Sequence, residues 1–282
     1  MAGQGFTDQA RQEPKDLRLD QAHSARMYDF YLGGKTNYAP DRETAIKALS
    51  VWPDAMVAAR ENRAFMHRAT RVLAREHGIR QWLDIGTGIP TSPNLHEVAQ
   101  SVVPDARVVY ADNDPIVLAH AQALMTSSAE GRTAYIEADA RDPESILSSP
   151  ELAQTLDLDR PLAVSLNAVL HFMPDDTDPY GVVRRLVDAV PSGSALAISH
   201  VTADFDPVAL GALADVYQAS GTAVKMRSRA EVEKFFDGLD LVEPGISVVH
   251  RWRPEDGEGL PVIGADLTDA NTSLWAGVAI KP

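Results

Sequence analysis

The sequence predicts a doubly wound α/β domain built on a mostly parallel sheet. From residue 80 onward, short apolar runs alternate with helical patterns, and this alternation is typical of strand–helix–strand units. The runs are apolar along most of their length, as expected for parallel strands covered by helices on both faces. The seven predicted strands are 81–86, 106–112, 133–139, 161–168, 194–201, 241–249 and 274–280.

The first part of the chain lies outside this alternation. Residues 1–78 read as mainly helical, so we predict a helical N-terminal extension followed by the α/β domain at 79–282. A helix near 55–76 carries an apolar stripe opposite a set of arginines. We favour a solvated arginine face over one that meets an acidic ligand. The arginines are Arg60, Arg63, Arg68, Arg71 and Arg75, and the stripe is Phe65, Ala69, Val72 and Leu73.

The predicted strands differ in how they are connected. Each of the first four precedes a plausible helix. The helix predicted at 114–127, for example, opens with Asp114 as its N-cap and Pro115 at its first position. No helix is predicted between 241–249 and 274–280. These two runs therefore predict an antiparallel pair that closes one edge of a seven-stranded sheet.

The composition limits the possible functions. With 282 residues, 45% of them apolar and 23% charged, the chain is typical of a soluble globular protein. It has no run near the ~20 apolar residues that cross a bilayer, and its polar start lacks a signal-peptide pattern, so we expect a cytoplasmic protein with no membrane partner. The formal net charge of −14 argues against a nucleic-acid partner. There are no cysteines and no metal motif, so no metal site is predicted. The oligomeric state stays open.

The most informative segment is Q-W-L-D-I-G-T-G-I-P-T, which begins with the first strand. The strand runs directly into Gly86, Thr87 and Gly88, the arrangement that lets a backbone approach a ligand closely. Asp84 precedes this turn, where a carboxylate would repel a pyrophosphate. A carboxylate there suits a ligand with an ammonium group, such as the methionine part of S-adenosylmethionine (SAM). Pro90 also departs from the G-x-G-x-x-G pattern of dinucleotide sites.

Acidic residues also end the second and third strands. Asp112 can accept hydrogen bonds from both hydroxyls of a ribose, with Asn113 beside it. Asp114 is the alternative, although helix capping is its simpler role. Asp139 can accept a hydrogen bond from an adenine amino group while the Ala140 amide donates to the ring. Because the ends of parallel strands face one crevice, these acids and that of the first strand predict a single site.

A second glycine segment, L-G-G-K-T-N-Y at 32–38, looks like the end of a phosphate-binding loop. That motif needs a glycine where this chain has Asp29, and it needs a buried strand before the loop. The preceding residues instead predict a short amphipathic helix. We therefore disfavour an ATP or GTP site.

The combined pattern resembles class I SAM-dependent methyltransferases. They share the D-x-G-x-G loop, the acid ending strand two, the D-A ending strand three and the antiparallel terminal pair. The chain is also similar, over nearly its whole length, to a bacterial S-adenosyl methyltransferase family first catalogued as a domain of unknown function. The segments that carry this closer resemblance are 25–45, 61–66, 84–91, 110–115, 169–172 and 251–254. Asn167 departs from the family pattern, in which an apolar residue is more usual.

The resemblance implies a Rossmann-like SAM-binding domain at 79–282 and S-adenosyl-L-homocysteine as the product. It also implies that the N-terminal segment is a lid, with glycines that permit hinge movement. The two tyrosines of the predicted first helix share one face and either stack on a ligand or pack on the domain. The predicted cofactor-binding residues are Tyr28, Gly33, Gly34, Asp84, Gly86, Thr87, Gly88, Asp112, Asn113, Asp139, Ala140 and Asn167.

Methyl transfer from a sulfonium needs no protein nucleophile, because positioning alone can lower the barrier by roughly 7–11 kcal/mol. A base adds about 10²–10⁴-fold if the acceptor is a hydroxyl or a protonated amine. His171 follows the fourth strand and His200 ends the fifth, so both are expected to point toward the crevice. Both also have a structural alternative, and His200 is narrowly preferred as the base. Tyr31 is a further candidate.

We therefore expect a SAM-dependent methyltransferase that acts on an oxygen or nitrogen atom of a small-molecule acceptor. An NAD(P)-binding oxidoreductase and a SAM-binding protein without turnover are the alternatives. The acceptor is not identified, although several residues point to a partly apolar one. These are Tyr31, Phe172, Met173, Phe205 and Tyr217.

Overall fold

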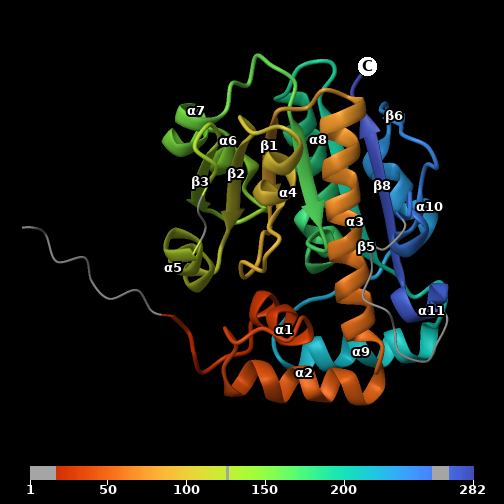
Figure 1. Ribbon diagram of the computed structural model, residues 1–282. Coiled ribbons are helices and arrows are strands. Elements are labelled where there is room, and N and C mark those ends of the chain that lie inside the picture. Colours follow the sequence, from red (N-terminus) through yellow and green to blue (C-terminus); the bar gives the residue numbers. More distant parts are fainter. Residues whose placement is uncertain (1–16, 125–126, 256–266) are drawn as a thin grey trace, which may run out of the picture.

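The computed structural model of the protein describes residues 17–124, 127–255 and 267–282. Eight strands lie within them: β1 Gln81–Ile85, β2 Arg107–Asp112, β3 Arg132–Glu137, β4 Ala163–Asn167, β5 Ala195–Val201, β6 Asp240–Leu241, β7 Ser247–Val248 and β8 Leu274–Ile280. They form one sheet in the order β3-β2-β1-β4-β5-β8-β6, with β7 also pairing with β8 (Figure 1). The first five strands are parallel, and β8 runs antiparallel to its neighbours. The predicted fold class, a mostly parallel Rossmann-like sheet with an antiparallel terminal strand, is confirmed.

Helices cover both faces of this sheet. On one face lie α3 (Ala55–Glu76) and α4 (Leu95–Val102). On the other lie α6 (Pro143–Leu147), α7 (Pro150–Thr155) and α8 (Pro179–Asp188). This three-layer arrangement explains why the strands read as uninterrupted apolar runs.

Successive side chains of each strand enter two separate hydrophobic cores, because neighbours along a strand point to opposite faces. Trp82 and Val108 belong to the core that includes α3 and α4. Their neighbours Leu83 and Val109 belong to the core that includes α6, α7 and α8. All four side chains are fully buried, so the two cores fix the sheet between the helical layers.

The helix after β2 begins as predicted. It is α5 (Pro115–Leu124), and the Asp114 carboxylate caps it by accepting a hydrogen bond from the Ile116 amide at 2.9 Å. The end of the predicted span 114–127 includes residues 125–126, which lie outside the described residues.

The antiparallel edge differs from the prediction in detail. The single strand predicted at 241–249 is wrong, because β6 and β7 pair separately with β8 and the chain between them leaves the sheet. Pro244 lies in this intervening stretch and has no amide hydrogen to give to a ladder. Part of the loop predicted to follow, 256–261, lies outside the described residues.

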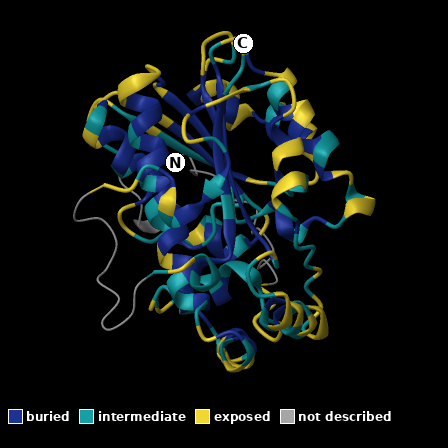
Figure 2. Ribbon diagram, turned by 90° about the vertical axis from the view of Figure 1, so that its right-hand side faces the viewer, coloured by how far each residue is buried: buried dark blue, intermediate teal, exposed yellow. Residues whose placement is uncertain are grey.

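The N-terminal helices lie across one end of the sheet. Figure 1 shows α1 (Ser24–Tyr31), α2 (Ala39–Val51) and α9 (Pro207–Ala219) at the end where the parallel strands finish. Their buried residues, together with those of α3, share one hydrophobic core with the sheet. Within that core Phe65 packs edge-on against Trp252, with ring centroids 5.3 Å apart. Figure 2 shows the strands largely buried and the exposed positions on the outer sides of the surrounding helices.

The arginines of α3 have more varied surroundings than the solvated face we favoured. Arg60 and Arg75 are exposed, but Arg68 is buried. Its guanidinium donates hydrogen bonds to the carbonyl oxygens of Trp252 at 2.8 Å and Val249 at 2.6 Å. The prediction is therefore wrong for Arg68, which joins α3 to the segment after β7. None of the helices in the described residues is long and apolar enough to cross a bilayer.

Candidate active site at the carboxyl ends of the strands

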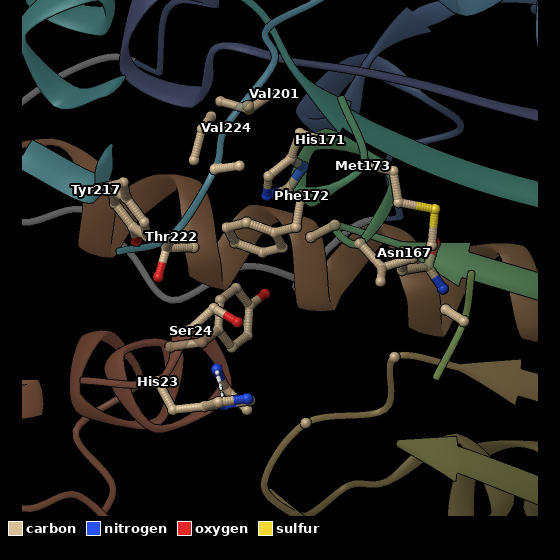
Figure 3. A pocket seen from close by; sticks show the side chains of 18 of the residues that line it. His23, Ser24, Asn167, His171, Phe172, Met173, Val201, Tyr217, Thr222 and Val224 are labelled. Carbon is tan, nitrogen blue, oxygen red and sulfur yellow. Dashed lines mark hydrogen bonds between the residues drawn. The ribbon is translucent and has the colours of Figure 1, made fainter. Parts of the chain in front are cut away.

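A cavity of about 760 Å³ lies at the carboxyl ends of the parallel strands, with residues of α1, α3 and α9 among its lining. It extends from the end of β3 to the start of β8 and crosses the β1–β4 junction, where the strand order reverses. Open parallel sheets bind ligands at such a reversal. Figure 3 shows residues that follow β4 facing His23 and Ser24 of the N-terminal segment across a shared space.

Asp84, near the end of β1, lines this cavity and is buried. Burial raises the pKa of the Asp84 carboxyl to about 7, and the Asp112 carboxylate also raises it, whereas the Arg63 guanidinium lowers it. A buried carboxyl with a raised pKa favours a cationic partner, because a nearby positive charge stabilises its ionised form.

The turn after β1 brings backbone to the cavity. Gly86 has a φ of +72°, a left-handed conformation that L side chains rarely adopt. A Cβ atom added there would lie 2.5 Å from Cγ2 of Val169, so the turn requires glycine for space as well as for conformation. Thr87 donates a hydrogen bond from its hydroxyl to the Asp84 carbonyl oxygen at 3.1 Å. Gly88 directs its amide toward β2.

Asp112, at the end of β2, holds this turn in place. Its carboxylate accepts hydrogen bonds from the amides of Gly88 and Asp114, at 2.8 and 2.9 Å. Burial raises the pKa of the Asp112 carboxyl, and these two hydrogen bonds lower it. Each carboxylate oxygen accepts one backbone hydrogen bond and keeps capacity for another donor.

Asp139 follows β3 at the far end of the cavity, next to Asn113 and Ala140, which also line it. Its carboxylate accepts hydrogen bonds from the Arg141 guanidinium and from the Arg141 amide. The Arg141 hydrogen bonds lower the pKa of the Asp139 carboxyl. Asp139 is therefore an ionised acceptor at the cavity edge.

The two histidines occupy different environments. His171 lies in a short 3₁₀ turn after β4 and lines the cavity, with its imidazole buried. His200 is fully buried and does not line the cavity; its ring bonds the Val201 carbonyl oxygen at 2.7 Å and Arg227 at 3.1 Å. The expectation that both point into the crevice is therefore correct for His171 and wrong for His200. The reason is that the His200 ring packs between Arg227 and the Phe235 ring and not at the cavity lining.

The tyrosines of α1 both line the cavity and link the N-terminal segment to other elements. Tyr31 lies with its hydroxyl 3.3 Å from that of Tyr217 on α9. The Tyr28 hydroxyl donates to the Ala59 carbonyl oxygen and accepts from Asn62 Nδ2, both at 2.9 Å. Neither tyrosine is free to move without breaking these contacts.

The glycines of the L-G-G-K-T-N-Y segment do not line the cavity. This loop instead wraps around Asp29, whose carboxylate accepts hydrogen bonds from the Thr36 amide and the Asn37 side chain. A Cβ atom on Gly34 would lie 2.0 Å from the Asp29 carboxylate. Gly33 and Gly34, which were predicted to contact the cofactor, therefore lie outside the cavity lining, in a turn between α1 and α2. Gly33 has a left-handed φ of +77°, and the Asp29 carboxylate leaves no room for a side chain at Gly34.

Two comparisons with known proteins decide the family. A family model described as "S-adenosyl methyltransferase" matches residues 10–282. Among solved structures, a DUF574 family protein from Streptomyces avermitilis MA-4680 is 50% identical, with a TM-score of 0.90 over 95% of this chain and 100% of that one. This chain belongs to the S-adenosyl methyltransferase family. SAM is therefore its cofactor.

Other comparisons agree with this family. A candidate methyltransferase from Thermobifida fusca YX is 38% identical to this chain, with a TM-score of 0.84 over 94% of this chain and 97% of that one. The plantazolicin methyltransferase BamL, solved with S-adenosyl-L-homocysteine, is 11% identical, with a TM-score of 0.53 over 91% of this chain and 95% of that one. That likeness shows the shared fold. No curated protein matches the sequence.

The cavity also has lining residues that the sequence did not predict. Trp52, Asn62 and Arg63 come from the helical extension, and 220–224 and Met226 come from the segment that follows α9. Asn62 left a signal, because it lies three residues before Phe65 and places a polar group on the buried stripe of α3. Arg63 belongs to the arginine face of α3, for which the sequence left both a solvated and a ligand-facing role open. Nothing in the sequence of the segment after α9 indicated that it lines the cavity.

Proposed function

We propose that this protein transfers a methyl group from SAM to an oxygen or nitrogen atom of a small-molecule acceptor. The observation that carries the proposal is the lining of one cavity by Asp84, Asp112 and Asp139, from three adjacent strands. The same cavity continues past these acids toward β5 and β8, which leaves room for a second molecule beside the donor.

The polar groups of the cavity match the parts of SAM in order. Asp84 would pair with the ammonium of the methionine part, because it is a buried carboxyl beside a glycine turn. Asp112 would accept hydrogen bonds from the ribose hydroxyls through the capacity its oxygens retain. Asp139 would accept from the adenine amino group, with Ala140 and Asn113 around the ring. The Gly86–Gly88 turn would let the backbone approach the donor closely.

The transfer itself depends on positioning. The acceptor atom attacks the methyl carbon in line with the bond to sulfur, so the cavity must hold donor and acceptor together and exclude water. Tyr28 and Tyr31 close one side of the cavity from α1. Of the two predicted histidines, His171 is the one that borders the acceptor space, and we assign the role of proton acceptor to it and not to His200.

Calorimetric titration with SAM and with S-adenosyl-L-homocysteine tests the proposal. We expect both ligands to bind, and Asp112→Asn to weaken both by about tenfold or more, because it removes a charged hydrogen-bond acceptor. Asp159→Asn is the matched control, since Asp159 is exposed and outside the cavity. Absence of SAM binding at millimolar ligand would contradict the proposal.

Two further measurements separate the alternatives. Binding of NADPH in place of SAM would favour an oxidoreductase, although a buried carboxyl at Asp84 opposes a pyrophosphate at the turn. Transfer of radiolabelled methyl from SAM into a metabolite extract distinguishes an enzyme from a SAM-binding protein without turnover. Under our proposal, label enters a small molecule, and Asp112→Asn reduces that incorporation.

A further inference from the structure

The cavity is divided by charge. Its charged or acid–base side chains belong mainly to the N-terminal segment, to α3 and to the ends of β1, β2 and β3. We call this part the donor half. The other part is lined from β4, β5, β8, α9 and the loop after α9, together with Tyr31 and Trp52 of the N-terminal segment, and we call it the acceptor half. Its only carboxylate in the described residues, Asp176, is exposed at the surface. A charged group inside this half would lose its hydration without meeting an opposite charge. The charged or acid–base residues of the donor half are Arg18, His23, Arg63, Asp84, Asp112, Asp139 and Arg141.

The acid–base groups of the acceptor half are themselves uncharged near neutral pH. Burial lowers the pKa of His171 well below its usual value, and the neighbouring His200 and Arg227 lower it further. Burial raises the pKa of Tyr217 to about 12 and also raises that of Tyr31. The half therefore offers a neutral imidazole and two protonated phenols.

Two polar side chains in this wall lack a protein partner. In the part of the chain that the structure describes, Oδ1 of Asn167 and Nδ1 of His171 are buried without a hydrogen bond. Leaving such groups unpaired is unfavourable, so both sites favour a ligand that can hydrogen-bond. Figure 3 shows the two side chains on the same side of the space, with the Phe172 ring extending into it.

Asn167 lies where donor and acceptor must meet. Asp84 of β1 pairs with Ser165 of β4, so Asn167, two residues later, lies beside the glycine turn that follows Asp84. The carboxamide therefore borders both halves of the cavity. The remaining lining of the acceptor half is mostly apolar or aromatic, with three hydroxyl side chains among it. The apolar and aromatic residues include Trp52, Tyr31, Phe172, Val201, Leu213, Tyr217, Val224 and Leu274, and the hydroxyl side chains are Thr177, Ser220 and Thr222.

We propose that the acceptor is an uncharged, largely apolar molecule whose methylated group, a hydroxyl or an N–H, is held between Asn167 and His171. This inference rests on the methyl transfer proposed above. The carboxamide of Asn167 hydrogen-bonds the reacting group and orients it toward the donor. A lone pair of the acceptor oxygen or nitrogen forms the bond to the methyl carbon, and the electrons of the broken carbon–sulfur bond stay on sulfur as S-adenosyl-L-homocysteine forms. The O–H or N–H proton passes to the His171 imidazole and from there to solvent.

The test uses naphthalene probes that differ only in their polar group, titrated into the protein saturated with S-adenosyl-L-homocysteine. The probes are neutral 2-naphthol, anionic 2-naphthoate and cationic 2-naphthylmethylammonium. We expect 2-naphthol to bind about tenfold or more tightly than either ion, because only the ions lose hydration without compensation. Equal or tighter binding of an ion, or no binding of 2-naphthol at millimolar concentration, would overturn the proposal.

A substitution of Asn167 then tests its proposed hydrogen bond to the acceptor. Asn167→Leu has a similar volume and lacks the carboxamide, so we expect 2-naphthol to bind about fivefold or more weakly. Binding of 2-methoxynaphthalene, which has no O–H to donate, should be unchanged. An equal loss for both probes, or loss of S-adenosyl-L-homocysteine binding in this variant, would assign Asn167 to packing or to the donor and would contradict the proposal. The titration with S-adenosyl-L-homocysteine alone reports on the donor site, so failure of the proposed function is seen separately.

Discussion

Among single residues, Asp84 is buried and lines the cavity, and its burial raises its pKa to about 7. Its ionised form is the one that can pair with the ammonium group of SAM. A carboxyl whose pKa is raised in the protein becomes ionised as the pH rises through that pKa. Under the proposed function, the protonation state of Asp84 therefore sets how the donor binds at neutral pH.

We predict that SAM affinity rises with pH up to about 7 and falls about tenfold per unit below it, because protonated Asp84 cannot pair with an ammonium. At pH 7, binding should release about half a proton, since about half of the Asp84 carboxyls are then protonated. Calorimetry in buffers of different ionisation enthalpy measures both effects. Asp84→Asn should remove the proton release, whereas Asp159→Asn should retain it; proton release that persists in Asp84→Asn would refute the prediction.

Gly86 provides a second prediction at this scale. Gly86→Ala should lower the free energy of unfolding by about 1–2 kcal/mol, because alanine is strained in the left-handed conformation, and it should also weaken SAM binding because the new methyl group meets Val169. Gly78→Ala is the matched control. Gly78 has a similar φ of +67° but has nothing within 4 Å of an added Cβ.

Urea unfolding and SAM titration of the two variants separate strain from function. Both variants should be destabilised, but only Gly86→Ala should lose affinity for SAM. If Gly78→Ala lost affinity to the same degree, the effect would reflect general instability and not the turn.

Much of the candidate site could be predicted from the sequence, namely those residues whose side-chain chemistry suits a ligand and which also lie at the end of a recognisable strand. The three acids were found because each ends or nearly ends a strand whose neighbours were also recognisable. His200 was wrongly predicted to point into the cavity. The pattern of a strand covered on both faces does not show which buried side chain will pack against a distant residue such as Arg227. Gly33 and Gly34 were assigned to the cofactor because no motif records why the turn needs glycine. Gly33 has a left-handed backbone conformation, and Gly34 lies against the Asp29 carboxylate.

At the scale of elements, the segment after β4 is held by one buried arginine. The Arg227 guanidinium donates to the carbonyl oxygens of Leu170 at 3.1 Å and Met173 at 3.0 Å, and to the Asp175 carboxylate at 2.6 Å. These contacts fix both ends of the turn that carries His171. The position of that imidazole at the cavity wall thus depends on a residue more than fifty positions later in the chain.

We predict that Arg227→Lys lowers the free energy of unfolding by roughly 1.5–3 kcal/mol, because a lysine cannot replace several directed hydrogen bonds from a charged group. Arg184→Lys, at an exposed position of α8, is the control and should change stability by less than about 0.5 kcal/mol. Urea unfolding checks both values. Equal stability of the two variants would show that Arg227 does not hold the turn.

Elements were predictable where periodicity was long and unbroken. The helix at 55–76 and the first five strands were found on those grounds, and so was the start of α5, which has a cap and a proline. The edge at 241–249 was not resolved, because residues that leave a ladder for a few positions and then rejoin it look like one apolar run. Pairing with β8, far along the chain, decides which of these residues are in the sheet.

Across the whole molecule, the helical extension and the sheet share one hydrophobic core. Met27 of α1, Ala45 of α2 and Phe65 of α3 belong to the same cluster as Trp252 and Val278. Asn62 adds a polar link, because it accepts a hydrogen bond from the Ser199 hydroxyl at 2.5 Å. The boundary predicted near residue 78 therefore does not separate two cores.

We predict a single cooperative unfolding transition for this chain, since one core cannot lose the extension and keep its packing. Far-ultraviolet circular dichroism and scanning calorimetry should give coincident midpoints. A separate early transition, with loss of helical signal while the sheet persists, would contradict this and would favour an independent N-terminal domain. The sequence could predict a lid, but it could not predict that the helical extension and the sheet share one hydrophobic core, because that depends on contacts between distant segments.

The place of Trp52 in the cavity lining gives the molecule an optical property. Indole emission responds to the polarity around the ring, and Trp52 lines the cavity that an incoming ligand would enter. The other three tryptophans lie outside that lining: Trp82 and Trp252 are fully buried in the core, and Trp275 is half-buried on β8. Intrinsic fluorescence should therefore report occupancy without an attached dye, and Trp52→Phe should abolish the signal, so that libraries of unlabelled metabolites can be screened against the native chain.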